Sequence, residues 1–501
     1  MRSRLVLAFA VLLAACSDGG SSGTPTVPAL PWGSFRQSPT NSAAAGAINR
    51  NTGVPRLLSG SGTLGEVTIS TPALDNGGNF YVGTTDGLIS VDDKGEMRWL
   101  FDRCDLSGTA ACTPETCVDV GPVSASPTVS AGGTIVVGSD DGRIFALHQR
   151  NDDIECMWMV PPGGTSPTFG VQSSPVLQID PRDLSLLSVF IGGGNGQLLA
   201  LNGIGTQRWA FPSAGQAGSA VSSSPAADAF SNLYITTPDG FLTSIEFGGG
   251  LNWTYPIGVP PAQPLLPSAA VGLSAYAVGA GGALYALTQN GILKWVYTPA
   301  AETSGSPAFL NQTFEAGADQ VVDTIVYIAD VNGTLYGVRD LTGMIAQPQR
   351  CSEDLETSCR KDSCEPNHGT CDRSTSRCTE GTDIGCNGDS CSDSEDDPNK
   401  CISLSGIRSA SALGDVPVQT SPIVSGDVFI VVGTADGQVC ARAQDDTVPN
   451  DEAEEKNPWI NGCVDLDGPD DDENLPTLSS PIIGPNGRIY VTTAKGLYVI
   501  E

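Results

Sequence analysis

The residues whose type and spacing could most readily do chemistry are the cysteines. The chain of 501 residues contains fifteen of them, and eight lie between positions 351 and 401, where aliphatic residues are scarce. Because such a segment cannot form a hydrophobic core, we expect four disulfide bonds to hold it as a small inserted module. A metal site is the alternative, but it usually requires histidine partners, and His368 alone lies nearby. The eight are Cys351, Cys359, Cys364, Cys371, Cys378, Cys386, Cys391 and Cys401.

Six further cysteines lie outside this segment and beyond Cys16. Cys440 and Cys463 flank a connection between two expected strands that carries a long acidic excursion over 445–462, so we predict that these two are bonded to each other. The other four allow three pairings, which the sequence does not separate. They are Cys104, Cys112, Cys117 and Cys156.

Other residue types point to no catalytic site. The chain has two histidines, so a histidine-based triad would have to use His148 or His368, and no G-x-S-x-G motif is present. The glycine-rich turns are not followed by Gly-Lys-Ser/Thr, as a phosphate-binding loop would be. We therefore predict no catalytic residues and no bound cofactor.

Calcium is the one metal ion that the sequence offers some support for. Asp465, Asp467 and Asp470 surround Gly468 and supply hard oxygen ligands. Their spacing lacks the terminal bidentate glutamate of a helix-loop-helix calcium site. They are weak calcium candidates, and a solvated acidic loop is the favoured interpretation.

The N-terminus has the features of an export signal. Arg2 and Arg4 precede an apolar run over 5–15, which is too short to cross a membrane as a helix. The run ends in Leu-Ala-Ala followed by Cys16, which resembles a bacterial lipoprotein signal; a plain secreted protein is the alternative. We expect a signal peptide over 1–15, a lipid on Cys16 and a flexible tether over 16–30. Ser17 favours the outer membrane of a bacterial cell envelope.

Composition limits the possible partners. Fifty-six acidic residues against twenty-five Lys and Arg give a formal net charge of −31. A basic face for nucleic acid or anionic membranes is therefore not expected, and the lipid is the expected contact with the membrane.

Eight copies of one pattern organise the chain. Each has a turn glycine, preceded in six copies by Asp or Asn, which predicts a two-residue hairpin because these residues tolerate a positive φ. An apolar residue follows the glycine, and two positions later a small residue recurs in seven copies, with Val499 as the exception. Something bulky is therefore expected to pack over the small residue. The glycines are Gly87, Gly142, Gly196, Gly240, Gly282, Gly333, Gly437 and Gly496.

Tryptophan is the expected bulky partner, on the fourth strand of each copy. Copy six has no tryptophan, and copy eight stops at Glu501 after its third strand. We predict that the segment 31–36 supplies the missing strand through Trp32, so that the two ends of the chain pair and close a ring. The blade tryptophans are then Trp32, Trp99, Trp158, Trp209, Trp253, Trp295 and Trp459.

The pattern S-P…YVG…DG-L-AL…G…W, with an N-terminal W…FR…SPTNS segment, resembles the eight-bladed propellers called pyrroloquinoline-quinone-like repeat proteins. The resemblance covers about residues 31–350 and 402–501. It implies an all-β, eight-bladed β-propeller closed by its N- and C-terminal segments. Blades one to six and the closing strand are expected in 31–350, blades seven and eight in 402–501, and the disulfide-rich insertion over 351–401 between blades six and seven.

Function is less well defined by the resemblance. Some propeller lipoproteins of this repeat class belong to the outer-membrane β-barrel assembly machinery, which implies an assembly role, although the cysteine-rich insertion and the acidic loops depart from that type. We expect a non-catalytic scaffold that binds an envelope protein or surface glycan through its loops. The alternative is a quinone- or calcium-dependent oxidoreductase. Such family members resemble one another in a disulfide between adjacent cysteines, and this chain contains no Cys-Cys pair.

Overall fold

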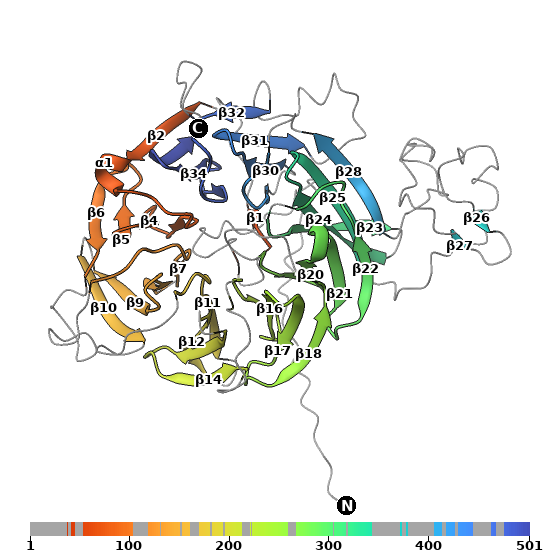
Figure 1. Ribbon diagram of the computed structural model, residues 1–501, viewed down its shortest axis with the longest axis horizontal. Helices are drawn as coiled ribbons and strands as arrows, with labels where there is room; N and C mark the ends of the chain where they lie inside the picture. Colours follow the sequence, from red (N-terminus) through yellow and green to blue (C-terminus); the bar gives the residue numbers. More distant parts are fainter. Residues whose placement is uncertain are drawn as a thin grey trace, which may run out of the picture.

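The computed structural model is a closed ring of eight β-sheets around a central axis (Figure 1). It describes residues 38, 42–45, 54–103, 119–342, 371–372, 377–378, 405–412, 417–443, 462–466 and 475–501, with gaps at 131, 151–152, 161–169, 181–182, 194–195, 213–220, 222, 259–266, 304, 317–318 and 426–428. The predicted all-β, eight-bladed propeller is confirmed. Among the described residues, no helix is long and apolar enough to cross a membrane.

Each blade is a four-stranded antiparallel meander, numbered here from the first strand nearest the axis to the fourth at the rim. Blade one holds β3 (Ala73–Leu74), β4 (Phe80–Thr84), β5 (Gly87–Val91) and β6 (Met97–Phe101). Blade two holds β7 (Thr128–Val129), β8 (Thr134–Gly138), β9 (Ile144–Arg150) and β10 (Asp153–Val160). Blade three holds β11 (Val176–Asp180), β12 (Asp183–Gly192), β13 (Leu198–Asn202) and β14 (Gln207–Phe211). Blade four holds β15 (Ala226–Ala227), β16 (Leu233–Thr237), β17 (Phe241–Ile245) and β18 (Leu251–Pro256).

The second half of the ring is less regular. Blade five holds β19 (Ala270–Val271), β20 (Ser274–Val278), the 3-10 turn η1 (Ala280–Gly282), β21 (Leu284–Thr288) and β22 (Leu293–Tyr297). Blade six holds β23 (Ala308–Ala316), β24 (Asp319–Ala329), β25 (Thr334–Thr342) and β28 (Ser405–Ala412). Blade seven holds β29 (Ile423–Ser425), β30 (Phe429–Gly433), β31 (Gln438–Ala443) and β32 (Cys463–Asp465), with β1 (Ala44–Ala45) added inside. Blade eight holds β33 (Ile482–Ile483), β34 (Ile489–Thr493), β35 (Gly496–Ile500) and β2 (Pro55–Gly60); α1 (Ser61–Leu64) follows β2, and β26 (Cys371–Asp372) pairs with β27 (Arg377–Cys378).

The turn glycines end the connection between the second and third strands in every blade. All eight have a positive φ, between 77° and 142°. In blade two, the Gly142 amide donates to the Ser139 carbonyl at 2.9 Å, so the glycine closes a four-residue turn. Where it is described and is not itself glycine, the residue before the turn glycine does not adopt a positive φ, since only Ala43 and Ser231 do so among described non-glycine residues; Gly281, before Gly282, has a φ of 65°. In the described Asp-Gly and Asn-Gly turns, the glycine alone therefore adopts a positive φ.

The ring closes through the N-terminal part of the chain, as predicted, but through another segment. β2 pairs antiparallel with β35, from Pro55 opposite Ile500 to Gly60 opposite Gly496. The prediction that the segment around Trp32 supplies this strand was wrong, and Trp32 itself lies outside the described residues. Arg56 lies opposite Val499, the position that holds a small residue in the other copies. Among the described residues, the partner on the fourth strand is thus an arginine and not a tryptophan, which explains why this copy can carry valine.

Blade six contains a second departure from the prediction. Its fourth strand, β28, follows the cysteine-rich segment in sequence and pairs with β25, with Gly337 opposite Ser409 and Asp340 opposite Ser405. The insertion therefore lies inside blade six, between its third and fourth strands, and not between blades six and seven. No tryptophan marks β28, so a tryptophan-based alignment could not locate it.

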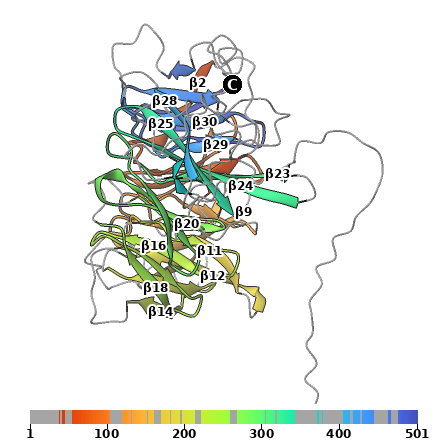
Figure 2. The same ribbon diagram turned by 90° about the vertical axis from the view of Figure 1, so that its right-hand side faces the viewer.

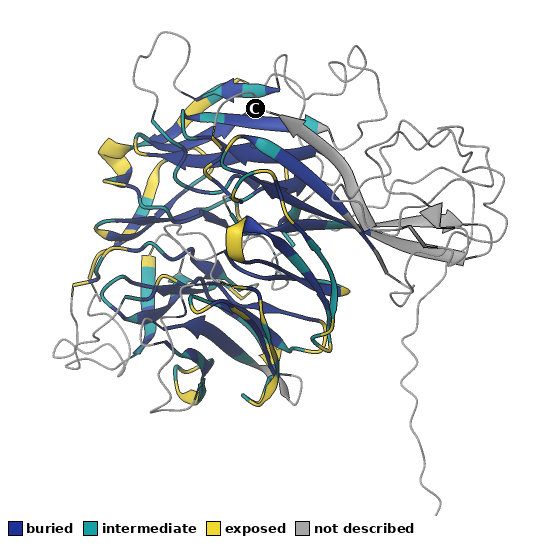
Figure 3. Ribbon diagram, turned by 45° about the vertical axis from the view of Figure 1, so that its right-hand side comes forward, coloured by how far each residue is buried: buried dark blue, intermediate teal, exposed yellow. Residues whose placement is uncertain are grey.

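The core consists of apolar layers between neighbouring blades. The second and third strands are buried almost throughout, whereas exposed residues gather in turns and on the outermost strands (Figure 3). One cluster joins Leu88 and Trp99 of blade one to Ile135 and Phe145 of blade two. Figure 2 shows the ring from the side, with the long strands β23 and β24 of blade six reaching out on one side. Each blade is stable because it buries its two faces against its neighbours.

Candidate functional site: rim, axis and loops

Five blade tryptophans lie directly opposite the predicted small residues. A register shift in the ladder follows or accompanies each such pair, which is typical of a β-bulge that re-aims a side chain. The small partner leaves room beside the indole, as the sequence pattern indicated. The pairs are Ser90 with Trp99, Ala146 with Trp158, Ala200 with Trp209, Ser244 with Trp253, and Ala286 with Trp295.

Three of these indoles also fasten their blade to the next one. The Nε1–H groups of Trp158, Trp209 and Trp253 donate to backbone carbonyls in the outer turn of the following blade, at 2.8–3.0 Å. A glycine of that turn lies against each ring. At Gly291 an added Cβ would lie 2.6 Å from the Trp253 ring, and the φ of Gly291 is +78°. Glycine is required here for both reasons.

Trp295 of blade five has a different partner, because the insertion in blade six replaces the short outer turn. Its Nε1–H donates to Asp340 Oδ1 at 3.0 Å. Tyr276 OH and Ser274 Oγ donate to Asp340 Oδ2 at 2.7 and 2.8 Å, and Lys294 forms an ion pair with the same carboxylate. The Asp340 side chain is 2% exposed and that of Lys294 15%. We refer to these five residues as the Asp340 cluster.

The Asp340 cluster joins two blades at the base of the insertion. Asp340 lies on β25, two residues before that strand ends, whereas its four donors lie on β20 and β22 of blade five. Burial, together with the charge of Asp340, raises the pKa of Tyr276 well above its ordinary value, so this phenol stays a donor. The cluster was not predicted from the sequence. The available signal was a lysine directly before Trp295 in the blade next to the one without its own tryptophan.

A ring of hydroxyls connects the blades near the axis. In each blade a Ser or Thr stands immediately before the first strand's proline, or before Ala269 in blade five. Its backbone N–H donates to the hydroxyl of the corresponding residue in the next blade, in seven consecutive hydrogen bonds of 2.8–3.2 Å. The hydroxyl ring consists of Thr71, Ser126, Ser174, Ser224, Ser268, Ser306, Ser421 and Ser480.

The hydroxyl ring satisfies backbone donors that the short first strands leave unpaired. The sequence pattern contains the recurring Ser-Pro, but the hydroxyl ring was not predicted from it. An invariant hydroxyl at eight matching positions was the signal for the ring. The arrangement is structural: its acceptors hold the inner ends of the blades in a fixed register.

The N-terminal segment lies beside these inner strands. β1 pairs in parallel with β29 of blade seven (Figure 1). Just before it, the Ser42 carbonyl accepts from Phe309 N of blade six at 2.9 Å, and the Ala43 carbonyl accepts from Val424 N of blade seven at 2.8 Å. Ala43 is fully buried. This segment, which we call the inner strap (residues 42–45), therefore bridges blades six and seven from the inside.

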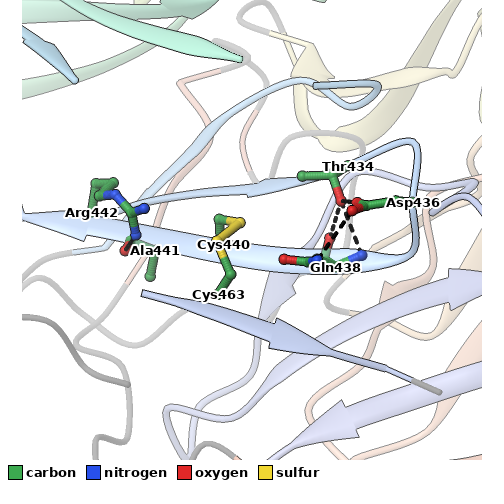
Figure 4. Close-up of a disulfide and its surroundings, with 7 residues drawn as sticks. All are labelled: Thr434, Asp436, Gln438, Cys440, Ala441, Arg442 and Cys463. Atoms are coloured by element: carbon green, nitrogen blue, oxygen red, sulfur yellow. Dashed lines mark hydrogen bonds between the residues drawn. A yellow bond between two sulfur atoms is a disulfide. The ribbon is translucent and has the colours of Figure 1, made fainter. Parts of the chain in front are cut away.

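The predicted disulfide between Cys440 and Cys463 is confirmed. The two residues lie opposite each other on β31 and β32, the third and fourth strands of blade seven (Figure 4). At the start of β31, two residues before Cys440, Gln438 N donates to Thr434 Oγ1 at 2.9 Å and Gln438 Nε2 to Asp436 Oδ2 at 3.1 Å. The bond therefore closes the base of the acidic connection, which lies outside the described residues over 444–461.

The remaining predicted site residues are only partly placed. Cys156 on β10 is disulfide-bonded, and its candidate partners lie outside the described residues. In the insertion, Cys371 and Cys378 lie opposite each other on β26 and β27, and the other six cysteines lie outside the described residues, so the four internal bridges stay a prediction. Trp459, Cys16 and His368 are also outside.

His148 and one of the three calcium candidates lie within the described residues. His148 lies on β9, paired with Thr134 and Glu155, and is partly exposed. Asp465 lies on β32 opposite Gln438, whereas its two companions, Asp467 and Asp470, are outside the described residues, so calcium stays a prediction. Within the described part of the chain, no group of three or more His, Cys, Asp or Glu side chains is arranged to hold a metal ion.

No family model and no curated protein matches the chain. Solved propeller structures do. Sqt1 of Saccharomyces cerevisiae is 11% identical with a TM-score of 0.50, over 91% of this chain and 98% of that one. A europium-containing methanol dehydrogenase is 12% identical with a TM-score of 0.49, over 92% and 89%. BamB from Moraxella catarrhalis is 14% identical with a TM-score of 0.40, over 76% and 83%. At these identities the similarity shows the fold alone.

Proposed function

We propose that this protein is a lipid-anchored, non-catalytic scaffold of the bacterial cell envelope that binds a partner protein or surface glycan through loops on its propeller. The observation that carries this proposal is the way the chain holds its two longest connections within a blade, over 343–404 and 444–462. Both lie between the third and fourth strands of a blade, at the rim, and each has a reinforced base. The Asp340 cluster holds the base of the insertion, and the Cys440–Cys463 bond closes the base of the acidic loop.

Such reinforcement is useful for recognition. A loop on a rigid base loses less conformational entropy when it binds a partner, and recognition residues commonly lie on loops that a stable scaffold holds in place. The eight interlocked blades supply that scaffold. An assembly role at the outer membrane is the more specific form of the proposal, and it follows from the sequence resemblance.

A pull-down from the organism's own envelope tests the proposal. Because Asp340 and Ser405 are paired neighbours on β25 and β28, residues 343–404 can be replaced by a short turn without removing a strand of blade six. We expect the tagged full-length protein to retain a partner that this shortened variant loses. Turnover in a dye-linked dehydrogenase assay with added quinone cofactor and calcium would instead establish the oxidoreductase alternative.

The anchor is tested separately through Cys16. The native chain should partition into the detergent phase of Triton X-114 and incorporate labelled palmitate, whereas Cys16→Ala should do neither. Palmitate incorporation by the Cys16→Ala variant would show that the lipid is not on this residue.

A further inference from the structure

Exposed apolar residues are concentrated on one face of blades three to five. In a four-stranded meander, the turn after the first strand and the turn after the third lie at the same end of the blade, opposite the turn glycine. Of the eleven large apolar residues that are exposed in the described part of the chain, six lie in or beside these turns of three consecutive blades, with exposed fractions of 49% to 76%. We call them the apolar tips: Ile179, Ile204, Phe230, Leu251, Leu273 and Ile292.

The apolar tips form one rigid surface. Ser231, next to Phe230, is hydrogen-bonded to Gln178, next to Ile179 of the preceding blade. Asn252 donates to Asn232 at 3.1 Å within blade four, and Gln289 donates to the Gly272 carbonyl at 3.0 Å within blade five. The first bond joins blades three and four, the other two join turns within one blade, and the Trp253–Gln289 bond joins blades four and five, so the tips keep a fixed spacing.

This face also differs from the rest of the molecule in charge. Among the residues of these turns whose exposure is described, Glu246 carries the one exposed charge, because Asp228 is buried and the carboxylate of Asp180 is paired with Arg208. The turn after β11 also contains Arg182 and Asp183, whose exposure lies outside the description. The equivalent outer turn of blade one, over 92–96, contains three acidic residues and a lysine. An apolar face with few charges, on a chain of net charge −31, is therefore a local feature.

The shape of the tips indicates what they contact. Ile204 lies between Gly203 and Gly205, Leu273 follows Gly272 and Ile292 follows Gly291, so single large side chains stand on turns of small residues. Convex tips of this kind offer a folded protein little concave surface, but they can enter the interfacial region of a bilayer. These turns contain no cluster of basic residues, so neutral lipids are favoured over anionic ones.

We propose that this face of blades three to five lies on a lipid bilayer of neutral headgroups, with the apolar tips inserted at its surface. The chain that precedes the structure supports this occupant. Cys16 lies 26 residues before Ser42, enough extended chain to span about 85 Å, so a lipid on Cys16 would keep the face close to the membrane. That step rests on the anchor of the proposed function, whereas the face itself does not.

Flotation of the full chain carrying Cys16→Ala with phosphatidylcholine vesicles tests the proposal, because no lipid then masks weak binding. We expect measurable binding that Ile204→Asp combined with Phe230→Asp reduces about tenfold or more, since two inserted side chains are lost. The matched control is Phe241→Asp, also in blade four and 36% exposed, but next to the turn glycine at the opposite end. This control should bind as the parent does.

Each other result would overturn the proposal. Without binding of the Cys16→Ala chain to neutral vesicles, or with an equal loss in Phe241→Asp, the face is not a membrane contact. Self-association that depends on the tips in analytical ultracentrifugation would show a second copy as the occupant. Capture of an envelope protein that depends on the tips, without vesicle binding, would show a protein partner. Palmitate labelling of Cys16 is unaffected by all of these, so the anchor and the face fail independently.

Discussion

Replacing Asp340 should loosen the junction between blades five and six more than any nearby surface change. Asp340→Ala removes the acceptor of three neutral donors and the counter-ion of Lys294 in one step. Removing one partner of a buried ion pair costs about 3–5 kcal/mol, because the remaining charge is left without compensation. Asp340→Asn keeps the shape and one acceptor oxygen, so we expect a smaller loss of about 2 kcal/mol.

Hydrogen–deuterium exchange measures this loss where it occurs. Peptides that contain β22 and β25 report local opening, and each 1.4 kcal/mol corresponds to about a tenfold faster exchange. Asp340→Ala should therefore accelerate exchange there by roughly two to three orders of magnitude. Glu246→Ala, which removes an exposed carboxylate of blade four, is the control and should leave these peptides unchanged.

A double-mutant cycle isolates the ion pair from the hydrogen bonds. Lys294→Met with Asp340→Asn should cost less than the two single substitutions added together, by about 1–3 kcal/mol. If the single costs add, or if Asp340→Ala accelerates exchange less than about tenfold, the Asp340 cluster does not hold the junction.

Three further outcomes are expected. Gly291→Ala should lower the free energy of unfolding, measured in guanidinium, by about 2–4 kcal/mol, because the φ of Gly291 is +78° and an added Cβ would meet the Trp253 ring. The control is Gly281→Ala, which has a positive φ but open space around it and should cost about 1–2 kcal/mol. Cys440→Ala with Cys463→Ala should cost about 3 kcal/mol for a bond that closes a 23-residue separation, and an unchanged midpoint would contradict this. Burial and adjacent aspartates raise the pKa of several tyrosines; the unfolded chain therefore ionises first, stability falls as the pH rises above about 10, and absorbance at 295 nm should show tyrosinate appearing together with unfolding and not before it.

The parts of the fold that repeat could be predicted from sequence. The turn glycines recur with a φ that suits glycine, and small residues such as Ala200 and Ser244 lie opposite the tryptophans that the pattern assigned to them. Both features are set within one blade and do not depend on how distant segments of the chain pair. Eight registers that agree leave few alternatives to a ring of similar blades.

The misassigned parts involve long-range pairing between segments that the repeat does not mark. β2 has no tryptophan, so composition favoured the segment around Trp32, although pairing with β35 requires only a strand of compatible shape. β28 lies far from β25 in sequence, and a repeat search stops at the insertion. The Asp340 cluster and the inner strap were missed for the same reason, since each depends on which residues meet across blades.

The departures from the repeat occur together in blades six to eight, and each is accompanied by another connection. In blades two to four the indole N–H donates to a backbone carbonyl in the outer turn of the next blade. Trp295 has no such turn beside it, and its indole N–H donates to the Asp340 carboxylate. Where blade six receives the insertion, the inner strap bonds its first strand to blade seven. Where blade eight ends without a fourth strand, β2 supplies one. A ring closes only if every junction holds, so a large insertion can persist at one junction only when the chain also supplies a substitute contact there. The reinforced junctions therefore indicate which loops the protein maintains at a cost in regularity, and these are the loops in which we expect recognition to lie.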